Sequence, residues 1–284
     1  MGAISGIFGY LLNWLYMLVN ENYGVAIILF SIILRVILLP ITYKQQISMK
    51  KTAKIQKELK KLQLKFKNNP EQLNKETMEL YKKEKMSPFS GCLSVIIQMV
   101  LILSVFWLVS QPLTYMKKID TTIIEDYKSQ IKEENGTIST YAEIEVIQKK
   151  AATDERVNIN MNFVGLDLSK VPNQNMTDIT VYIIPLLYII SSVISIKLTT
   201  MMQDNDKKNK KDENSDEKET PNEAEAVQQM GKTMNYFMPL ITVWIAFIAP
   251  LGLALYWFVS NVLMIAERLI LKKIIDSKED NENV

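Results

Sequence analysis

The 284-residue sequence contains no histidine and a single cysteine, Cys92. The absence of histidine excludes most zinc sites, histidine-ligated haem and the histidine-dependent forms of serine and cysteine catalysis. One cysteine cannot form a disulfide within the chain. A glycine-rich phosphate-binding loop is also absent. We therefore predict that the protein is not an enzyme and that it needs no metal and no cofactor.

Charge is not scarce, but it is strongly segregated along the chain. Charged blocks alternate with five long apolar runs, at 24–41, 92–109, 179–196, 236–249 and 251–266. A single helix over 236–266 would be roughly 46 Å long, well beyond a hydrocarbon core of about 30 Å. Pro250-Leu251-Gly252 is therefore interpreted as a turn between two spans. This pattern predicts an all-α polytopic membrane protein with five transmembrane helices, at 23–43, 88–110, 179–200, 231–250 and 251–273.

The first apolar run carries one arginine, Arg35, near its middle. An arginine at the bilayer centre costs roughly 2.5–3.5 kcal/mol on insertion scales. None of the other apolar runs contains Asp, Glu or His, and Glu21, Asp178 and Glu267 lie at their ends. Water in a cavity, or an external anion, would then have to solvate the guanidinium. The alternative is snorkelling to the inner headgroups, but Lys44 is roughly 13 Å further along the helix, which is far for snorkelling.

Two further segments have helical patterns. Residues 3–20 place apolar side chains at helical spacing together with Tyr10, Trp14 and Tyr16, which suit a membrane interface. We predict an amphipathic interfacial helix in residues 1–22, and an additional span is the alternative. Residues 44–87 hold thirteen lysines against five glutamates, with an apolar heptad stripe from Ile55 to Phe66 and a helix start at Pro70. This pattern predicts a helical hairpin with an apolar seam.

The lysines of that hairpin have two interpretations. They can be a solvated face and topology signal, or a docking surface for anionic lipid, RNA or a ribosome. The predicted contact surface consists of Lys50, Lys54, Lys57, Lys61 and Lys65.

Lysine-rich short loops stay on the cytoplasmic side, which predicts the orientation. The hairpin, the loop at 201–230 and the tail at 274–284 are then cytoplasmic, and the loop at 111–178 is extracellular. The N-terminus lies outside the cell membrane and the C-terminus inside it. Residues 203–226 and those after Ile275 lack apolar periodicity, which predicts disorder.

Several stretches together resemble the YidC/Oxa family of membrane protein insertases. They are NYGVAIIL (22–29) through Arg35 and LPIT (39–42), SPFSGCLSVIIQ (87–98), NFVGLDL (162–168) and PLGLALYWFVSN (250–261). The resemblance covers about residues 4–273 and is to Gram-positive-type members, which lack the large external domain. It implies five core spans around a hydrophilic groove that is open to the cytoplasm and to lipid and closed on the outside.

The resemblance implies insertion and folding of membrane proteins, alone or with the Sec translocon, and often directly from the ribosome. The implied partners are nascent membrane proteins and the lipid bilayer, without a specific nucleic-acid sequence, and we expect a monomer. The family's groove arginine maps onto Arg35. The acidic tail beyond Lys273 argues against ribosome binding through that tail.

Polar residues inside the spans are the other candidates for the groove. We predict a substrate groove formed by Arg35, Gln98, Ser191, Ser195, Tyr256 and Asn261. Serines often bond to their own helix backbone, so packing alone would explain many of them. A specialised family member with narrow clients, for example one used in sporulation, is an alternative function. A small-molecule transporter or channel is another, but it would usually show intramembrane carboxylates or inverted repeats.

Overall fold

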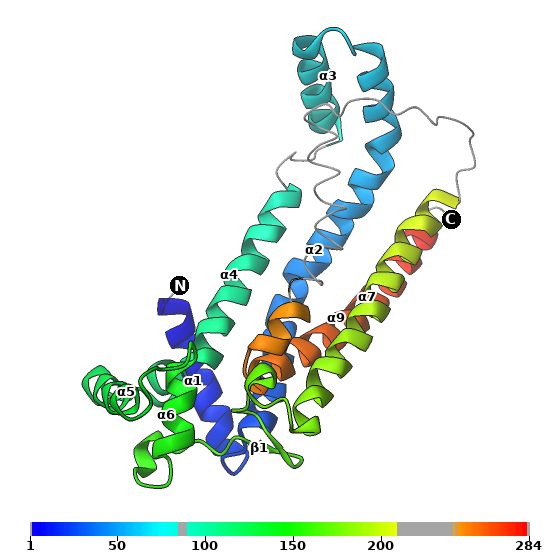
Figure 1. Cartoon of the computed structure of the whole chain (residues 1–284). Coiled ribbons are helices and arrows are strands. Elements are labelled where there is room, and N and C mark those ends of the chain that lie inside the picture. Colours follow the sequence, from blue (N-terminus) through cyan, green and yellow to red (C-terminus); the bar gives the residue numbers. More distant parts are fainter. Residues whose placement is uncertain (1, 85–89, 209–240, 242, 283–284) are drawn as a thin grey trace. The chain divides into compact units, whose positions relative to one another are not determined.

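The computed structural model describes residues 2–84, 90–208, 241 and 243–282. The predicted loop at 201–230 and the predicted span at 231–250 therefore lie largely outside the described residues. The longer elements (Figure 1) are α1 Gly2–Leu18, α2 Tyr23–Lys65, α3 Pro70–Lys83, α4 Ser90–Ser110, α5 Thr121–Asn135, α6 Ala142–Lys150, α7 Ile183–Lys208 and α9 Leu251–Glu282. A two-stranded antiparallel hairpin joins β1 Asn162–Phe163 to β2 Leu166–Asp167.

Three helices in the described part of the chain are long and apolar enough to cross a membrane. They cover Tyr23–Ser48, Ile179–Met201 and Leu251–Ile275. Two shorter apolar helices cover Gly2–Leu18 and Ile96–Ser110. The predicted all-α membrane protein is confirmed at this level, and the count of five spans stays a prediction.

Helix α2 is a single helix of 43 residues, so the predicted first span and the first arm of the lysine-rich hairpin are continuous. Lysine, glutamine and glutamate favour helix, which explains why Lys44 does not end it. The second arm, α3, begins at Pro70, as the sequence predicts. The Asn69 side chain accepts a hydrogen bond from the Gln72 amide, and Pro70 has no amide hydrogen that would need a partner there.

Residues 111–178 form an ordered region rather than a simple loop. Helix α5 begins after Asp120, whose side chain accepts a hydrogen bond from the Thr122 amide, and it ends at Gly136, which has a φ of +75°. Helix α6 contacts α5 and the short 3₁₀ helix η2, Glu155–Val157. Buried isoleucines and valines of α5 and α6 give this region an apolar core of its own: Ile124, Ile131, Ile144, Val146 and Ile147.

The predicted disorder after Ile275 is wrong for most of the tail, because α9 continues to Glu282. The residues beyond Gly252 include no glycine and no proline, so nothing in the sequence terminates the helix. Helix α7 likewise continues to Lys208, six residues into the segment for which disorder is predicted.

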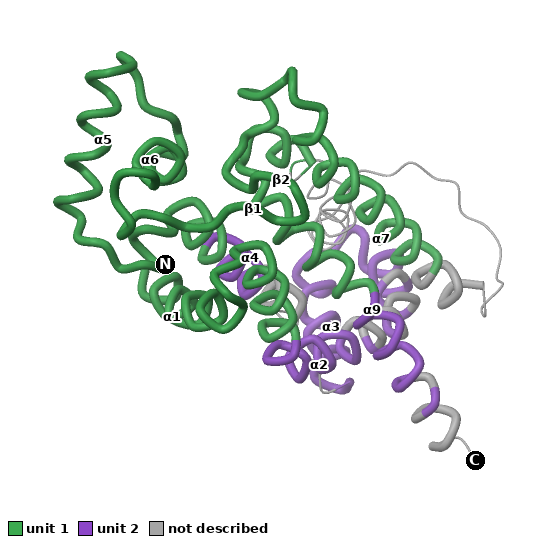
Figure 2. The backbone as a smooth tube through the Cα atoms, turned by 90° about the horizontal axis from the view of Figure 1, so that it is seen from below, with its two compact units in different colours: residues 1–35, 104–265 green, residues 36–103, 266–284 purple. Residues whose placement is uncertain are grey.

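The chain divides into two compact units (Figure 2). Unit 1 consists of Met1–Arg35 and Ser104–Ile265, and unit 2 consists of Val36–Leu103 and Ala266–Val284. Unit 1 has a core of buried aromatic and aliphatic side chains that includes Tyr16, Phe30, Leu108, Met116 and Leu253. In unit 2 the apolar seam of the lysine-rich hairpin is formed in part by Ile55, Leu73 and Leu80, all buried.

Within unit 1, residues 160–170, here called the hairpin segment, bond to three helices. The Asn160 amide donates to the Tyr16 hydroxyl at 2.9 Å, and the Tyr23 amide donates to the Asn160 carbonyl at 3.2 Å. At the start of α9, the amides of Leu251 and Gly252 donate at 2.9 Å to two carbonyls of the hairpin segment. The hairpin segment therefore links the end of α1 and the first residues of α2 and α9.

Candidate functional site

Arg35 lies in α2 within unit 1, and its side chain is half-buried. Its Nη2 atom donates a hydrogen bond to the Ser260 carbonyl of α9 at 3.2 Å. That carbonyl is neutral, whereas guanidinium groups form their strongest hydrogen bonds with carboxylates and phosphates. The arrangement can therefore hold the guanidinium in an orientation from which it could bind an anionic group.

Tyr256 belongs to the same cluster, one helical turn before Ser260. Its ring is buried, and the Ser260 side chain and the charge of Arg35 both act on its hydroxyl. The structure thus brings together two of the predicted groove residues, Arg35 and Tyr256, and adds Ser260. The sequence could not identify the role of Ser260, because the arginine binds its backbone carbonyl, which every residue type has.

Three other predicted groove residues lie where α7 packs on α9. The Asn261 Nδ2 atom donates to the hydroxyls of Ser191 at 3.0 Å and Ser192 at 3.2 Å. Ser191 in turn donates to the Tyr188 carbonyl at 2.9 Å, which is the local backbone bond expected of a helical serine. Asn261, Ser191, Ser192 and Ser195 are all buried. This second cluster cross-links two helices, which is the arrangement expected of a packing contact.

The remaining predicted residues lie in unit 2. Gln98 is exposed on α4, and it belongs to unit 2, whereas the other predicted groove residues belong to unit 1. Of the predicted contact lysines, Lys61 and Lys65 are exposed, and Lys65 Nζ lies 5.0 Å from the centroid of the Phe66 ring. Lys50, Lys54 and Lys57 are also on α2, but their side chains lie outside the described part of the structure.

Sequence reasoning missed two carboxylates with partners. In unit 2, the Thr42 hydroxyl donates to Glu267, 225 residues away in sequence. In unit 1, Glu143 of α6 is only 2% exposed and accepts hydrogen bonds from the Thr114 amide at 3.0 Å and its hydroxyl at 2.5 Å. Burial raises the pKa of Glu143, although the bonds from Thr114 and the charge of Lys128 act in the opposite direction. No local sequence signal identifies either carboxylate, because each partner is distant in sequence.

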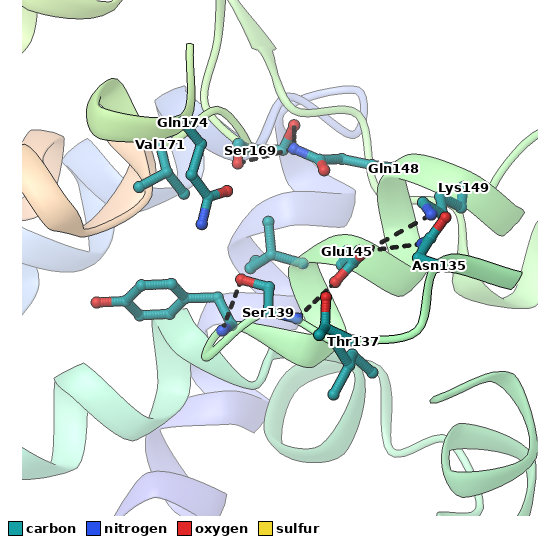
Figure 3. Close-up of a pocket in the computed structure, with 12 residues that line it drawn as sticks. Asn135, Thr137, Ser139, Glu145, Gln148, Lys149, Ser169, Val171 and Gln174 are labelled. Carbon is teal, nitrogen blue, oxygen red and sulfur yellow. Dashed lines mark hydrogen bonds and ion pairs between the residues drawn. The ribbon is translucent and has the colours of Figure 1, made fainter. Parts of the chain in front are cut away.

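A cavity of about 400 Å³ opens between the end of α5, helix α6 and residues 169–174 (Figure 3). Its charged groups pair with each other, since Glu145 accepts from the Ser139 amide at 2.7 Å and lies 3.6 Å from Lys149. Gln148 donates to the carbonyl and hydroxyl of Ser169, both at 3.0 Å. These pairings account for most of the polar lining, and none of the predicted groove residues lies there. Among the described residues, no cluster of three or more His, Cys, Asp or Glu side chains could hold a metal ion.

Comparison with known proteins gives matches over most of the chain. A membrane protein insertase YidC of Treponema denticola is 29% identical over 252 residues, which are 89% of this chain and 34% of that protein. One of Caldanaerobacter subterraneus subsp. tengcongensis is 26% identical over 270 residues, which are 95% of this chain and 94% of that protein. A third, of Fusobacterium nucleatum, is 38% identical over 109 residues, which are 36% of this chain and 53% of that protein.

The chain spans about a third of the length of the Treponema denticola relative. The family described as 60Kd inner membrane protein matches residues 14–279. Because this match covers nearly the whole chain, the chain belongs to the 60Kd inner membrane protein family.

Proposed function

We propose that the chain is a membrane protein insertase, which inserts proteins into the cytoplasmic membrane and helps them to fold. The names of its relatives support this function, and the matches extend over most of the chain. The Treponema denticola relative is much longer than this chain, so its activity is carried over here as part of the proposal. The step does not require nucleotide hydrolysis, because transfer of apolar surface into lipid is worth about 25 cal/mol per Å².

The proposal includes five spans, with the N-terminus outside and the C-terminus inside. Three span-length apolar helices and the shorter apolar helix at 96–110 support it. Lysine-rich segments tend to stay cytoplasmic, which assigns the α2–α3 hairpin to the inside and residues 111–178 to the outside. The bonds from the hairpin segment to the first residues of α2 and α9 would then close the outer end of the site.

The observation that carries the proposed mechanism is the hydrogen bond between Arg35 and the Ser260 carbonyl within apolar helices. A client segment with an acidic residue in its short outer tail would enter the groove from the cytoplasm. Its carboxylate would replace the neutral carbonyl as the acceptor for the guanidinium, since charge-assisted bonds are roughly twice as strong as neutral ones. The apolar part of the client would then move into lipid, which releases the carboxylate to the outer side.

We propose further that clients arrive either directly from the ribosome or through the Sec translocon. The exposed Lys61 and Lys65 support a contact surface on the lysine-rich hairpin for an anionic partner. Attraction between such a surface and ribosomal RNA or anionic lipid is electrostatic and weakens with salt.

The test is complementation in a cell depleted of its own insertase. Wild type, Arg35→Ala and Arg35→Lys are scored for growth and for insertion of a single-span client with an acidic outer tail. We expect wild type and Arg35→Lys to support insertion and Arg35→Ala to lose most of it, because alanine removes the charge. Arg156→Ala is the matched control, since Arg156 is exposed and lies outside the spans.

Two outcomes would count against the proposal. If wild type reaches the membrane but rescues neither growth nor insertion, the chain is not an insertase for this client. If Arg35→Ala inserts the acidic client as well as Arg156→Ala does, the arginine does not act in the groove. A client with a neutral tail should be inserted by all four proteins.

A further inference from the structure

The turn of the β1–β2 hairpin has an unusual residue in a strained conformation. Phe163 pairs with Leu166, so the turn contains two residues, Val164 and Gly165. Both have positive φ values, +51° and +78°. Two-residue turns of this kind favour Asn-Gly, whereas a β-branched residue such as valine rarely adopts a positive φ. Residues held in such strained conformations often mark functional positions.

The same valine is also exposed. Val164 is 85% exposed. Two apolar residues that follow the hairpin in the sequence, Met176 and Ile179, are 68% and 82% exposed. Ile179 begins the 3₁₀ helix η4, Ile179–Tyr182, which contacts β2. We call these three residues the apolar rim. Apolar side chains that are exposed together on a folded region can mark a surface that contacts something apolar.

The rim is held in a defined place within unit 1. The hairpin segment bonds to α1, α2 and α9, as described above. The ring of Phe163 packs so closely on Gly24 of α2 that a Cβ atom there would lie 2.4 Å from it. The tip next to Phe163 is therefore fixed at the same end of unit 1 as the first residues of α2, α7 and α9 (Figure 1).

The rim continues directly into the exposed apolar face of α7. The apolar span that includes α7 begins at Ile179 itself. Beyond it, exposed side chains on the same span are Ile183, Leu186, Leu187 and Ile190. On a spanning helix such a face contacts lipid, and its first residues lie at the membrane interface. Lys170 and Asp178, which pair at 2.7 Å, lie beside the rim and suit the polar headgroup level.

We propose that the Val164 tip, together with Met176 and Ile179, inserts into the lipid leaflet at the outer ends of the spans and anchors the hairpin segment there. The occupant of this surface is the bilayer itself. The inference rests on the proposed placement of α7 as a span, and it does not depend on insertase activity. Amphipathic helices at the membrane interface bury their apolar face roughly 5–10 Å into the boundary between headgroups and acyl chains, and we expect a comparable depth for this tip.

The test uses the full chain in phospholipid vesicles, with Cys92→Ser as the background. Single cysteines at Val164, Met176, Glu133 and Val193 carry an environment-sensitive fluorophore. Quenching by lipids brominated at shallow and deep positions gives the depth of each label, and iodide reports exposure to water. Glu133 is exposed on α5 and serves as the water control, and Val193 is exposed on α7 and serves as the lipid control.

We expect the labels at 164 and 176 to be quenched by shallow bromines and protected from iodide, and the label at 133 to show the reverse. If the label at 164 behaves like the one at 133 while the label at 193 is quenched by deep bromines, the proposed insertion of the tip is wrong and the placement of α7 as a span still holds. If 193 is also open to iodide, the placement of α7 as a span has failed instead.

A second variant keeps the turn while removing the apolar tip. Val164→Asn introduces the residue that this turn favours, so the hairpin should still form. With the fluorophore on a cysteine at position 176, we compare this variant with the protein that keeps Val164. We expect the variant to be quenched less by shallow bromines and more by iodide. Unchanged quenching at 176 would show that the tip does not hold the rim in the leaflet, and would overturn the proposal.

Discussion

The amide of Asn261 illustrates how single polar residues act inside these helices. Its Nδ2 atom bonds to both Ser191 and Ser192, and it adjoins Ser260, whose carbonyl binds Arg35. Neighbouring residues of one helix point in different directions, so Asn261 and Ser260 serve separate clusters. We infer that Asn261 connects helices, whereas Arg35 is the group that would meet an anionic client.

This inference predicts a stability effect without a loss of function. Asn261→Ala removes the donor to two buried hydroxyls and should lower the free energy of unfolding by about 0.5–1.5 kcal/mol, the usual worth of hydrogen bonds between membrane helices. Unfolding in mixed detergent measures the loss, with Val262→Ala as the control on the exposed neighbour. Client insertion should persist at temperatures where the variant is folded. A variant that is fully stable but inactive would assign Asn261 to the groove.

Glu143 predicts a dependence of stability on pH. Burial raises its pKa in the folded state. A carboxyl group with a raised pKa contributes most to stability when it is protonated, below its unfolded pKa, and this contribution is lost as the pH rises through the folded pKa. Lowering the pH from 7 toward 5 should therefore raise the protection factors of the amides in α5 and α6, that is, their slowing relative to the intrinsic exchange rate at each pH. Glu143→Gln cannot ionise and should reduce this dependence.

The control for that experiment is Glu133→Gln, a change to an exposed carboxylate on α5. In addition to the bonds from Thr114, the charge of Lys128 acts on Glu143. If Glu143→Gln and Glu133→Gln retain the same pH dependence as wild type, another group is responsible.

At the scale of elements, α1 approaches the π-helical turn η1, Leu113–Lys117, closely. A Cβ atom on Gly9 would lie 1.7 Å from the Tyr115 carbonyl oxygen, so the two backbones touch only because residue 9 is glycine. Gly9→Ala should push α1 away and lower the free energy of unfolding by about 1–3 kcal/mol, the usual cost of overpacking. Thermal unfolding in detergent measures this loss.

Gly6→Ala is the matched control for that change. Its Cβ would meet only the Lys118 Nζ atom at 3.5 Å, which is an ordinary contact with the end of a flexible side chain. Alanine also favours helix over glycine by roughly 1 kcal/mol. Gly6→Ala should therefore be neutral or stabilising, and an equal loss in both variants would rule out the close approach as the cause.

Elements with a strong local signal could be predicted from the sequence. Apolar runs of span length predicted where α2 and α9 begin and predicted the span from Ile179 that includes α7, which itself begins at Ile183. Pro70 predicted where α3 begins. The region 111–178 could not be predicted in detail, because its helices are short and their buried faces are completed by distant parts of the chain. The prediction of disorder after Ile275 was wrong for most of the tail, because charged composition alone does not stop a helix that has no glycine or proline.

The candidate site could be predicted only where a residue has a local sequence signal. Arg35 stands out by its cost in an apolar run, which is a local signal. Its bond to the Ser260 carbonyl and the pairing of Thr42 with Glu267 join positions 225 residues apart. Such contacts depend on how helices pack, and periodicity within one helix carries no information about them. The bonds of Asn261 to two serines of α7 also depend on helix packing, so the sequence could not predict them.

At the scale of the whole molecule, the hairpin segment and the lysine-rich hairpin lie in different units. The first exposes apolar side chains, and the second exposes lysines. The hairpin segment, in unit 1, binds the first residues of two apolar helices and carries exposed apolar side chains. The α2–α3 hairpin, in unit 2, exposes lysines on a helix that continues an apolar span. The physical chemistry of a bilayer separates such segments, because basic residues are retained in the cytoplasm.

The orientation that follows can be tested with two matched lysines. Lys61 of α2 and Lys132 of α5 are both exposed on helices, and each is changed to cysteine in a Cys92→Ser background. In intact cells, a maleimide that cannot cross membranes should label Lys132→Cys and not Lys61→Cys, because the proposed topology places residues 111–178 outside and the lysine-rich hairpin in the cytoplasm. Permeabilised cells should label both. The opposite pattern in intact cells would reverse the topology, and with it the direction in which a client would cross the groove at Arg35.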